Sequence, residues 1–234
     1  MASIKELKET LAYSCNILAV EGHWDNILGH VSVRIPGQDR ILMKPHSFGF
    51  EEIRPQHVIV VDLNGKKVEG KYERHSEVFI HTEIYKARPD VNCVVHSHPP
   101  YATAFGSLRL PLRPISHEGV MFNNGLPLFD YTTALIRTPE LGQEVAKSLG
   151  NCRGVLMKNH GSTVVGETIE VATLYAIFLE KAARIQLLAT ASGEPSWTSD
   201  EEAQVKYEQI YTPHRLDSMW EYFVRRVKKF RKST

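Results

Sequence analysis

Apolar residues recur with two different periods along the chain and divide it into helical and extended segments. Near the N-terminus they return every three or four residues from Ser3 to Ala19, which predicts an amphipathic helix. Ser3 and Glu6 have the spacing of a capping box at its start. The next segments alternate in polarity or are rich in β-branched residues, which is typical of strands. These strands are predicted at 30–35, 40–43 and 57–63, with a tight turn at Asn64-Gly65 into a returning strand at 66–69.

The rest of the chain mixes helices with strands. A helix is predicted from Ser76, as its N-cap, to about Ala87, ahead of Pro89. Further strands are predicted at 92–98, 154–158 and 163–165, a long helix at 168–191, a capping box at Ser199 and Glu202, and a last helix at 216–230. Neither a linker nor a repeat interrupts these segments, so we expect one α/β domain over residues 1–234. Its sheet would be mixed or antiparallel, and its C-terminal helices would begin at about residue 199.

Composition narrows the classes of function. The 234 residues include 28 Lys+Arg and 27 Asp+Glu, and a net charge of +1 argues against a general nucleic-acid binder. No apolar run reaches the roughly 18 residues of a membrane span, and the N-terminal segment lacks the pattern of a signal peptide. The three cysteines, Cys15, Cys93 and Cys152, are too far apart in sequence to indicate a disulfide framework or a cysteine zinc site. We therefore expect a soluble, cytoplasmic protein with no membrane or nucleic-acid partner.

The strongest chemical signal is the pair His96 and His98 in a predicted strand. Side chains two residues apart on a strand point to one face, about 6.6–6.8 Å apart along the chain. Two imidazoles in this arrangement can reach one metal ion, although two surface histidines would give the same pattern. A catalytic metal usually has three protein ligands and an open position. His160, ahead of Gly161 at the end of an apolar strand, is the candidate third ligand, and a structural histidine is the alternative.

Glu77 is a fourth candidate because it lies at a predicted helix start, after Ser76. A carboxylate in the first turn ordinarily interacts with the helix dipole. Beside a metal it could instead be a ligand or a proton carrier. His81, one turn further on, could share its face, but helix packing explains it equally well.

Taken together, these segments resemble the class II aldolase/adducin family. The resemblance covers roughly residues 5–190 and rests on four blocks in the family's order and spacing: Gly29-His30-Val31-Ser32-Val33-Arg34, Ser76-Glu77, residues 88–98 and Asn159-His160-Gly161. It implies a three-layer α/β/α sandwich with a central mixed, largely antiparallel sheet. It further implies a homotetramer with active sites at subunit interfaces. A divalent metal on His96, His98 and His160 is implied as well, with Glu77 as the acid/base carboxylate and a further candidate ligand.

The sequence departs from the sugar-phosphate aldolases of the family where these bind phosphate. His30 stands in place of an Asn, His46-Ser47 in place of a Thr-Gly pair, and His75 in place of a Ser. Drift could explain each change by itself. Imidazole, ammonium and guanidinium groups suit a planar carboxylate or a ring hydroxyl. We therefore expect a small anionic substrate, bound by His30, Lys44, His46, Ser47, Arg74, His75 and Ser76.

These departures favour the decarboxylase branch of the family. The resemblance to this branch implies loss of a carboxyl group ortho to a ring hydroxyl, with 3-hydroxy-2-methylpyridine-4,5-dicarboxylate, from vitamin B6 degradation, as the preferred substrate. Glu77 and His117 would manage protons, since His117 stands by spacing where the aldolases have a tyrosine. Mn²⁺ is the preferred ion on the strength of the resemblance, and Zn²⁺ is the alternative, because imidazole suits several metals.

Two other functions stay open. A class II aldolase or epimerase acting on a sugar phosphate or a related hydroxy-carbonyl compound would be a carbon–carbon lyase like the decarboxylase. A non-catalytic adducin-like binding module would be expected to have lost the metal histidines. Four histidines need no functional explanation: His23, His57, His81 and His214.

Overall fold

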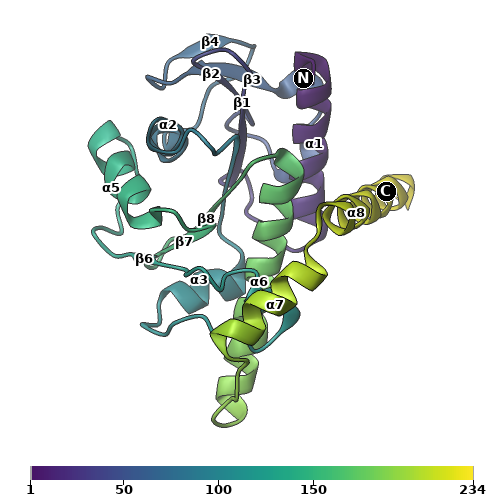
Figure 1. Ribbon diagram of the computed structural model, residues 1–234. Coiled ribbons are helices and arrows are strands. Elements are labelled where there is room, and N and C mark those ends of the chain that lie inside the picture. Colours follow the sequence, from purple (N-terminus) through teal and green to yellow (C-terminus); the bar gives the residue numbers. More distant parts are fainter. Residues whose placement is uncertain (1, 234) are drawn as a thin grey trace.

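The computed structural model describes residues 2–233, with the side chains of residues 232 and 233 excepted, and is built around one sheet of eight strands (Figure 1). The strand order is β4-β3-β2-β1-β5-β8-β7-β6, and every neighbouring pair is antiparallel except β6 and β7. The predicted mixed, largely antiparallel sheet is thereby confirmed. The strands are β1 (His30–Arg34), β2 (Arg40–Met43), β3 (Ile59–Asp62), β4 (Lys67–Glu69), β5 (Cys93–Ser97), β6 (Leu128–Phe129), β7 (Gly154–Met157) and β8 (Gly161–Gly166).

Helices cover both faces of this sheet, as the three-layer prediction requires. Figure 1 shows α2 and α5 on one side and α1 and α6 on the other. Each side has its own cluster of buried apolar residues. The helices are α1 (Ile4–Val20), α2 (Val78–Ala87), α3 (Pro100–Gly106), α4 (His117–Val120), α5 (Pro139–Leu149), α6 (Ile169–Ser192), α7 (Asp200–Ile210) and α8 (Pro213–Ser233), with 3₁₀ turns at Phe50–Glu52 and Pro55–His57.

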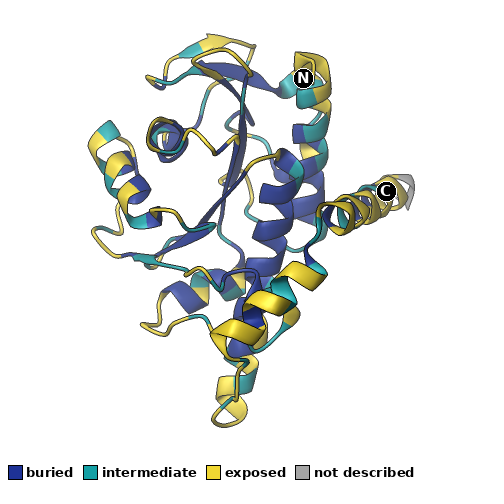
Figure 2. Cartoon of the chain, viewed as in Figure 1, coloured by how far each residue is buried: buried dark blue, intermediate teal, exposed yellow. Residues whose placement is uncertain are grey.

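Helix α6 contributes more buried residues than any other described helix, and α7 and α8 lie outside it (Figure 2). One of its buried side chains is the carboxylate of Glu180. This carboxylate accepts hydrogen bonds from the backbone N–H groups of Tyr101, at 3.0 Å, and Ala102, at 2.7 Å. These are two of the N–H groups that a helix start leaves without a partner, here in α3. The contact therefore fixes the chain directly after the His96–His98 segment.

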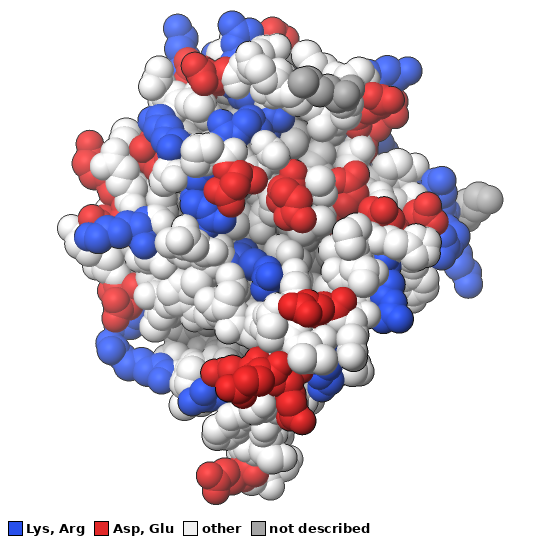
Figure 3. All heavy atoms as spheres, in the orientation of Figure 1, with Lys and Arg blue, Asp and Glu red and all other residues white. Residues whose placement is uncertain are grey.

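The described residues have neither one sign of charge over the face shown in Figure 3 nor a helix suited to span a membrane. On the face shown in Figure 3, basic and acidic side chains are interspersed rather than gathered by sign. Within the described residues, no helix combines the length and the apolar character needed to cross a lipid bilayer.

Most predicted elements are present, and the capping box of Ser3 and Glu6 is confirmed by both of its hydrogen bonds. The prediction of Ser76 as an N-cap is wrong, because Glu77 occupies that position without capping the helix through its side chain. Its carboxylate instead accepts a hydrogen bond from the Ile136 N–H, at 2.8 Å. At Ser199 the side chain caps α7 by accepting from the N–H of Glu202, which is one half of the predicted capping box; among the described contacts the Glu202 carboxylate does not return the bond.

The sequence analysis missed α3, α4, α5 and β6, and it began the last helix three residues late. For α3 the reason is that Pro99-Pro100 reads as a stop, whereas Pro100 occupies the first helical position, where proline is tolerated. For α5 a signal was present: Thr138 caps the helix and Pro139 follows at its first position. β6 is only two residues long and pairs with β7, which no local pattern reveals.

The contact between α2 and α5 provides a test of the packing. A Cβ atom added at Gly142 would fall well inside van der Waals distance of the Phe79 carbonyl oxygen, and 2.7 Å from Cγ of Glu83. Since the first of these is backbone, the two helices would have to separate. We expect Gly142→Ala to lower the free energy of unfolding in urea by about 1–3 kcal/mol, despite alanine's better helix propensity. Lys147→Ala, at an exposed position of α5, is the matched control and should change it by less than about 0.5 kcal/mol. A stabilised Gly142→Ala variant would contradict this packing.

Candidate active site

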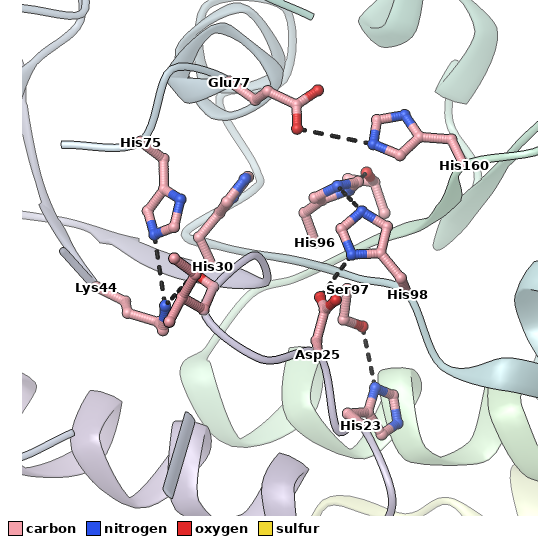
Figure 4. Close-up of polar contacts among 12 residues, drawn as sticks. His23, Asp25, His30, Lys44, His75, Glu77, His96, Ser97, His98 and His160 are labelled. Carbon is pink, nitrogen blue, oxygen red and sulfur yellow. Dashed lines mark hydrogen bonds and ion pairs between the residues drawn. The ribbon is translucent and has the colours of Figure 1, made fainter. Parts of the chain in front are cut away.

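Three histidine rings meet where β5 ends and β8 begins (Figure 4). His96 lies in β5, His98 directly follows this strand, and His160 precedes β8. The ring centroids of the three are 4.7–5.0 Å apart. One ligand nitrogen from each lies within 4.8 Å of the others. The structure thus brings the three predicted ligands together.

The turn that carries His160 depends on its two neighbours. Asn159 has a φ of 53°, in the left-handed region that Asn adopts more readily than most residues. Gly161 approaches β5 so closely that a Cβ there would lie 2.6 Å from the His98 ring and would also meet the Ser97 carbonyl oxygen. Gly161 is therefore needed because there is no room for a side chain, whereas Asn159 is the residue that adopts the left-handed backbone conformation.

Two of the three rings are oriented by hydrogen bonds from behind. His98 Nδ1 lies 2.5 Å from Asp25 Oδ2, and His96 Nδ1 lies 3.0 Å from Thr163 Oγ1. The Thr163 hydroxyl donates its proton toward Met157 Sδ, so it accepts from His96 Nδ1. The Asp25 carboxylate can only accept, so His98 Nδ1 is assigned as a donor as well. Each Nε2 then carries a lone pair, and the two Nε2 atoms are 3.0 Å apart. Such outer partners fix the tautomer of metal-binding histidines.

These donors fit a divalent metal. His160 Nε2 is buried, and no hydrogen-bond partner for it is present within the described residues. The Glu77 Oε2 atom is 3.7 Å from it, too far for a hydrogen bond. Burial holds the pKa of His96 well below its ordinary value, which keeps the ring in the neutral form that ligation requires. Converging lone pairs repel one another unless a cation lies among them, so the cluster can hold a metal with a position left open.

Glu77 joins this cluster from the start of α2. Burial raises the pKa of its carboxyl group, but the nearby His160 ring and the Ile136 N–H outweigh burial and hold that pKa below its ordinary value. The group is therefore an ionised carboxylate at neutral pH. It can accept a proton or coordinate a cation, and its oxygen lies within 4.8 Å of ligand nitrogens of His30 and His96.

A second layer of histidines lies behind the first. His30 Nδ1 is 2.6 Å from His81 Nε2, and His81 Nδ1 is 2.6 Å from Ser32 Oγ. The Ser32 hydroxyl continues the chain to the Tyr85 hydroxyl at 2.8 Å. The ring of His30 lies 4.8 Å from that of His96. The sequence analysis gave His81 no functional explanation, because its spacing from Glu77 suits helix packing equally well.

The cluster opens into a cleft of about 440 Å³. Six of the predicted site residues line it: His46, His75, Ser76, Glu77, His98 and His160. Six others line it that the sequence analysis did not single out as site residues: Asp25, Leu28, Thr133, Leu135, Arg137 and Asn159. Five of these six come from two irregular segments, 25–28 and 133–137, whose approach to the cluster no periodic pattern reveals.

Residues 9–187 match the Class II Aldolase and Adducin N-terminal domain. The chain belongs to this family. It is 33% identical to a 3,4-dihydroxyphthalate decarboxylase of Arthrobacter keyseri, over 80% of this chain and 79% of that protein. It is 34% identical to an L-fuculose phosphate aldolase of Escherichia coli O6:H1, over 79% of this chain and 84% of that protein.

Solved structures agree with this family. The chain matches an L-fuculose 1-phosphate aldolase from Glaciozyma antarctica PI12 with a TM-score of 0.87 and 26% identity, over 100% of this chain and 94% of that one. Decarboxylases and aldolases both break carbon–carbon bonds. The prediction of a carbon–carbon lyase is therefore confirmed at the level of these relatives, and so is the prediction of the family.

The remaining predicted binding residues occupy different positions around the cleft. Lys44 is buried, with its Nζ 3.4 Å from His75 Nε2, and burial lowers its pKa to about 8. Ser47 has a φ of 70°, where the family's aldolases have Gly, and its hydroxyl lies 2.6 Å from His46 Nδ1. Arg74 donates to the His75 carbonyl oxygen and does not line the cleft.

His117, the predicted proton donor, is not brought to the cluster by this chain alone. It opens α4 as an exposed residue and is absent from the lining of the cleft. Its carbonyl oxygen accepts a hydrogen bond from the Tyr211 hydroxyl at 2.7 Å, which fixes α4 against the end of α7. Its role stays a prediction that needs a second subunit.

The buried histidines predict a dependence of stability on pH. Burial lowers the pKa of His81 to about 3, whereas an unfolded histidine titrates near its ordinary value of 6.5. Above that value neither state binds the proton; below it only the unfolded chain does, and stability falls by about 1.4 kcal/mol per pH unit for this group. We expect His81→Gln to lose this component, so its urea-unfolding free energy should decline less steeply than that of the wild type between about pH 6 and 4. Parallel profiles for the two proteins would contradict a buried, neutral His81.

Proposed function

We propose that this protein is a metal-dependent decarboxylase that removes a carboxyl group ortho to a ring hydroxyl. The observation that carries the proposal is the convergence of three histidine lone pairs beside an ionised Glu77, in a cleft where imidazoles replace the aldolases' phosphate-binding groups. The relative that acts on 3,4-dihydroxyphthalate supports it, since that compound has a carboxyl group next to a ring hydroxyl. We propose 3-hydroxy-2-methylpyridine-4,5-dicarboxylate, which has the same arrangement, as the substrate.

His96, His98 and His160 are the proposed metal ligands, with Mn²⁺ preferred over Zn²⁺ and Glu77 as a further candidate ligand. A divalent ion bound there would stabilise negative charge on the ring oxygen and on the neighbouring carboxylate. Glu77, as a carboxylate, is suited to accept the proton of the ring hydroxyl. In the reaction the bond between the ring carbon and the carboxyl carbon breaks, CO₂ leaves, and the same ring carbon takes up a proton.

The other predicted binding residues, in the cleft lining or next to it, would bind the substrate. His30, His46 and His75 offer ring nitrogens, Ser47 and Ser76 offer hydroxyls, and Lys44 supplies a positive charge behind His75. The proton for the ring carbon is assigned to His117 of a neighbouring subunit. We therefore propose a homotetramer with active sites at its interfaces and one domain per chain, consistent with the exposure of His117.

The first test compares two reactions. Metal-loaded protein is expected to release CO₂ from 3-hydroxy-2-methylpyridine-4,5-dicarboxylate or 3,4-dihydroxyphthalate, and a chelator should abolish this until Mn²⁺ is restored. His160→Ala should lose both the bound metal, measured by elemental analysis, and the activity, because one of three ligands is gone. His214→Ala removes an exposed histidine of α8 and should change neither. Full metal stoichiometry in His160→Ala would contradict the ligand set.

A second candidate, a class II aldolase or epimerase, is favoured by the close structural match to an L-fuculose 1-phosphate aldolase. The same protein should therefore be assayed for cleavage of fuculose- and ribulose-type phosphates. Turnover of these compounds alone, without CO₂ release from either dicarboxylate, would replace the decarboxylase by the aldolase. The adducin-like binding module is disfavoured because all three metal histidines are present and converge.

Sharing of the active site between subunits can be tested by complementation. His117→Phe should lower kcat strongly while the metal stays bound, because it removes only the proton donor. Co-expressing His117→Phe with His160→Ala should restore about a quarter of the wild-type activity, since random mixing gives that fraction of interfaces both intact residues. If each active site were built from one chain, the mixed oligomers would stay inactive. Unchanged rate constants in His117→Phe would remove this residue from the mechanism.

A further inference from the structure

Arg137 offers a guanidinium group without a partner to the catalytic cleft. It is exposed and lines the same hollow as His46, His75, Glu77 and His160. None of the described side chains or carbonyl groups pairs with its guanidinium. Arg74, by contrast, donates to the His75 carbonyl oxygen and lies over the Phe79 ring.

The backbone holds Arg137 at a fixed place beside Glu77. Its neighbour Ile136 is fully buried, and the Ile136 N–H donates to Glu77 Oε1 at 2.8 Å. On the other side Thr138 caps helix α5 by accepting a hydrogen bond from the Leu141 N–H. Arg137 is thus anchored at both ends, next to the carboxylate that faces the histidine cluster.

The charges that line the cleft leave this guanidinium free for a ligand. Asp25 and Glu77 are the carboxylates among the lining residues, and both are engaged, with His98 and with the Ile136 N–H respectively. Arg137 is the one Lys or Arg among these lining residues, because Lys44 lies behind His75. A guanidinium fork matches a carboxylate in a planar, two-point contact.

We propose that Arg137 is a specificity-determining residue that binds the carboxylate group the substrate retains, while the carboxylate that is lost lies at the histidine cluster. This inference rests on the proposed decarboxylase function and narrows its substrates to aromatic dicarboxylates. It also moves the guanidinium contact, which the sequence analysis gave to Arg74, to a residue that lines the cleft.

The test compares substrates with and without the second carboxylate. In Arg137→Gln, KM for 3,4-dihydroxyphthalate should rise about 10- to 100-fold, the size of a lost charge-assisted contact. KM for 2,3-dihydroxybenzoate, which lacks the retained carboxylate, should change less than about twofold, because no contact to it is lost. Arg137→Lys, which keeps the charge but not the fork, should fall between the wild type and Arg137→Gln for the dicarboxylate.

Two further variants test whether the carboxylate contact belongs to Arg137 or to another arginine. Arg40→Gln removes an exposed guanidinium from the far end of β2 and should leave both KM values unchanged. If Arg74→Gln rather than Arg137→Gln shows the loss confined to the dicarboxylate, the assignment is overturned. An equal loss for both substrates in Arg137→Gln overturns it as well.

Binding of unreactive ligands separates this inference from the proposed function. Calorimetry with the metal-loaded protein should show phthalate binding more tightly than benzoate, and Arg137→Gln should abolish the difference. If the wild type releases no CO₂ from any aromatic dicarboxylate, the decarboxylase proposal fails, while the phthalate measurement still tests Arg137. Equal affinity of the wild type for phthalate and benzoate overturns the role of Arg137 whatever reaction the enzyme catalyses.

Discussion

The structure of the catalytic end depends on one electrostatic constraint: ring nitrogens with bare lone pairs are held facing one another. His96 Nε2 and His98 Nε2 are 3.0 Å apart, and each is kept free of hydrogen because its Nδ1 donates elsewhere. The two acceptors, Thr163 and Asp25, come from β8 and from the segment after α1. Three contacts therefore keep the same two rings in place. They are the pairing of β5 with β8, the contact of Asp25 with His98, and the hydrogen bonds from the start of α3 to Glu180.

The second layer meets a related constraint, because several imidazoles are buried in contact. The His30 ring lies 4.5 Å from that of His75 and 4.8 Å from those of His81 and His96. Charged rings at these distances would repel in a region of low dielectric, and burial together with the neighbouring rings holds the pKa of His30 well below its ordinary value. The Ser32 hydroxyl pairs with His81 Nδ1 and with the Tyr85 hydroxyl, so these buried polar groups have the hydrogen-bond partners that burial requires.

Sequence reasoning reached the fold and the cluster of three histidines because both are encoded in short periodic or motif-like segments. The alternation of β5 placed His96 and His98 on one side, and the Asn159-His160-Gly161 turn provided the third ring. It failed where position depends on tertiary contacts: Asp25 and Arg137 lie in segments without periodicity, and the role of His81 appears only when β1 packs against α2. His117 was predicted from its spacing, but in the described chain it is exposed and lies outside the lining of the cleft, so its role stays a prediction.

The positive charges around the cleft help to distinguish a dicarboxylate substrate from a sugar phosphate. Because burial holds the pKa values of His30 and His75 below their ordinary range, these two of the imidazoles that replace the aldolases' phosphate-binding groups add hydrogen-bonding atoms but little positive charge. His75 Nε2 is moreover engaged with the Pro45 carbonyl oxygen at 3.0 Å. Positive charge comes from Lys44, whose pKa is lowered to about 8, and from Arg137 at the rim. A compact phosphate dianion needs several N–H donors gathered at one point, whereas a flat ring with two neighbouring carboxylates presents its negative charge at two points, which matches two separate cations with neutral rings between them.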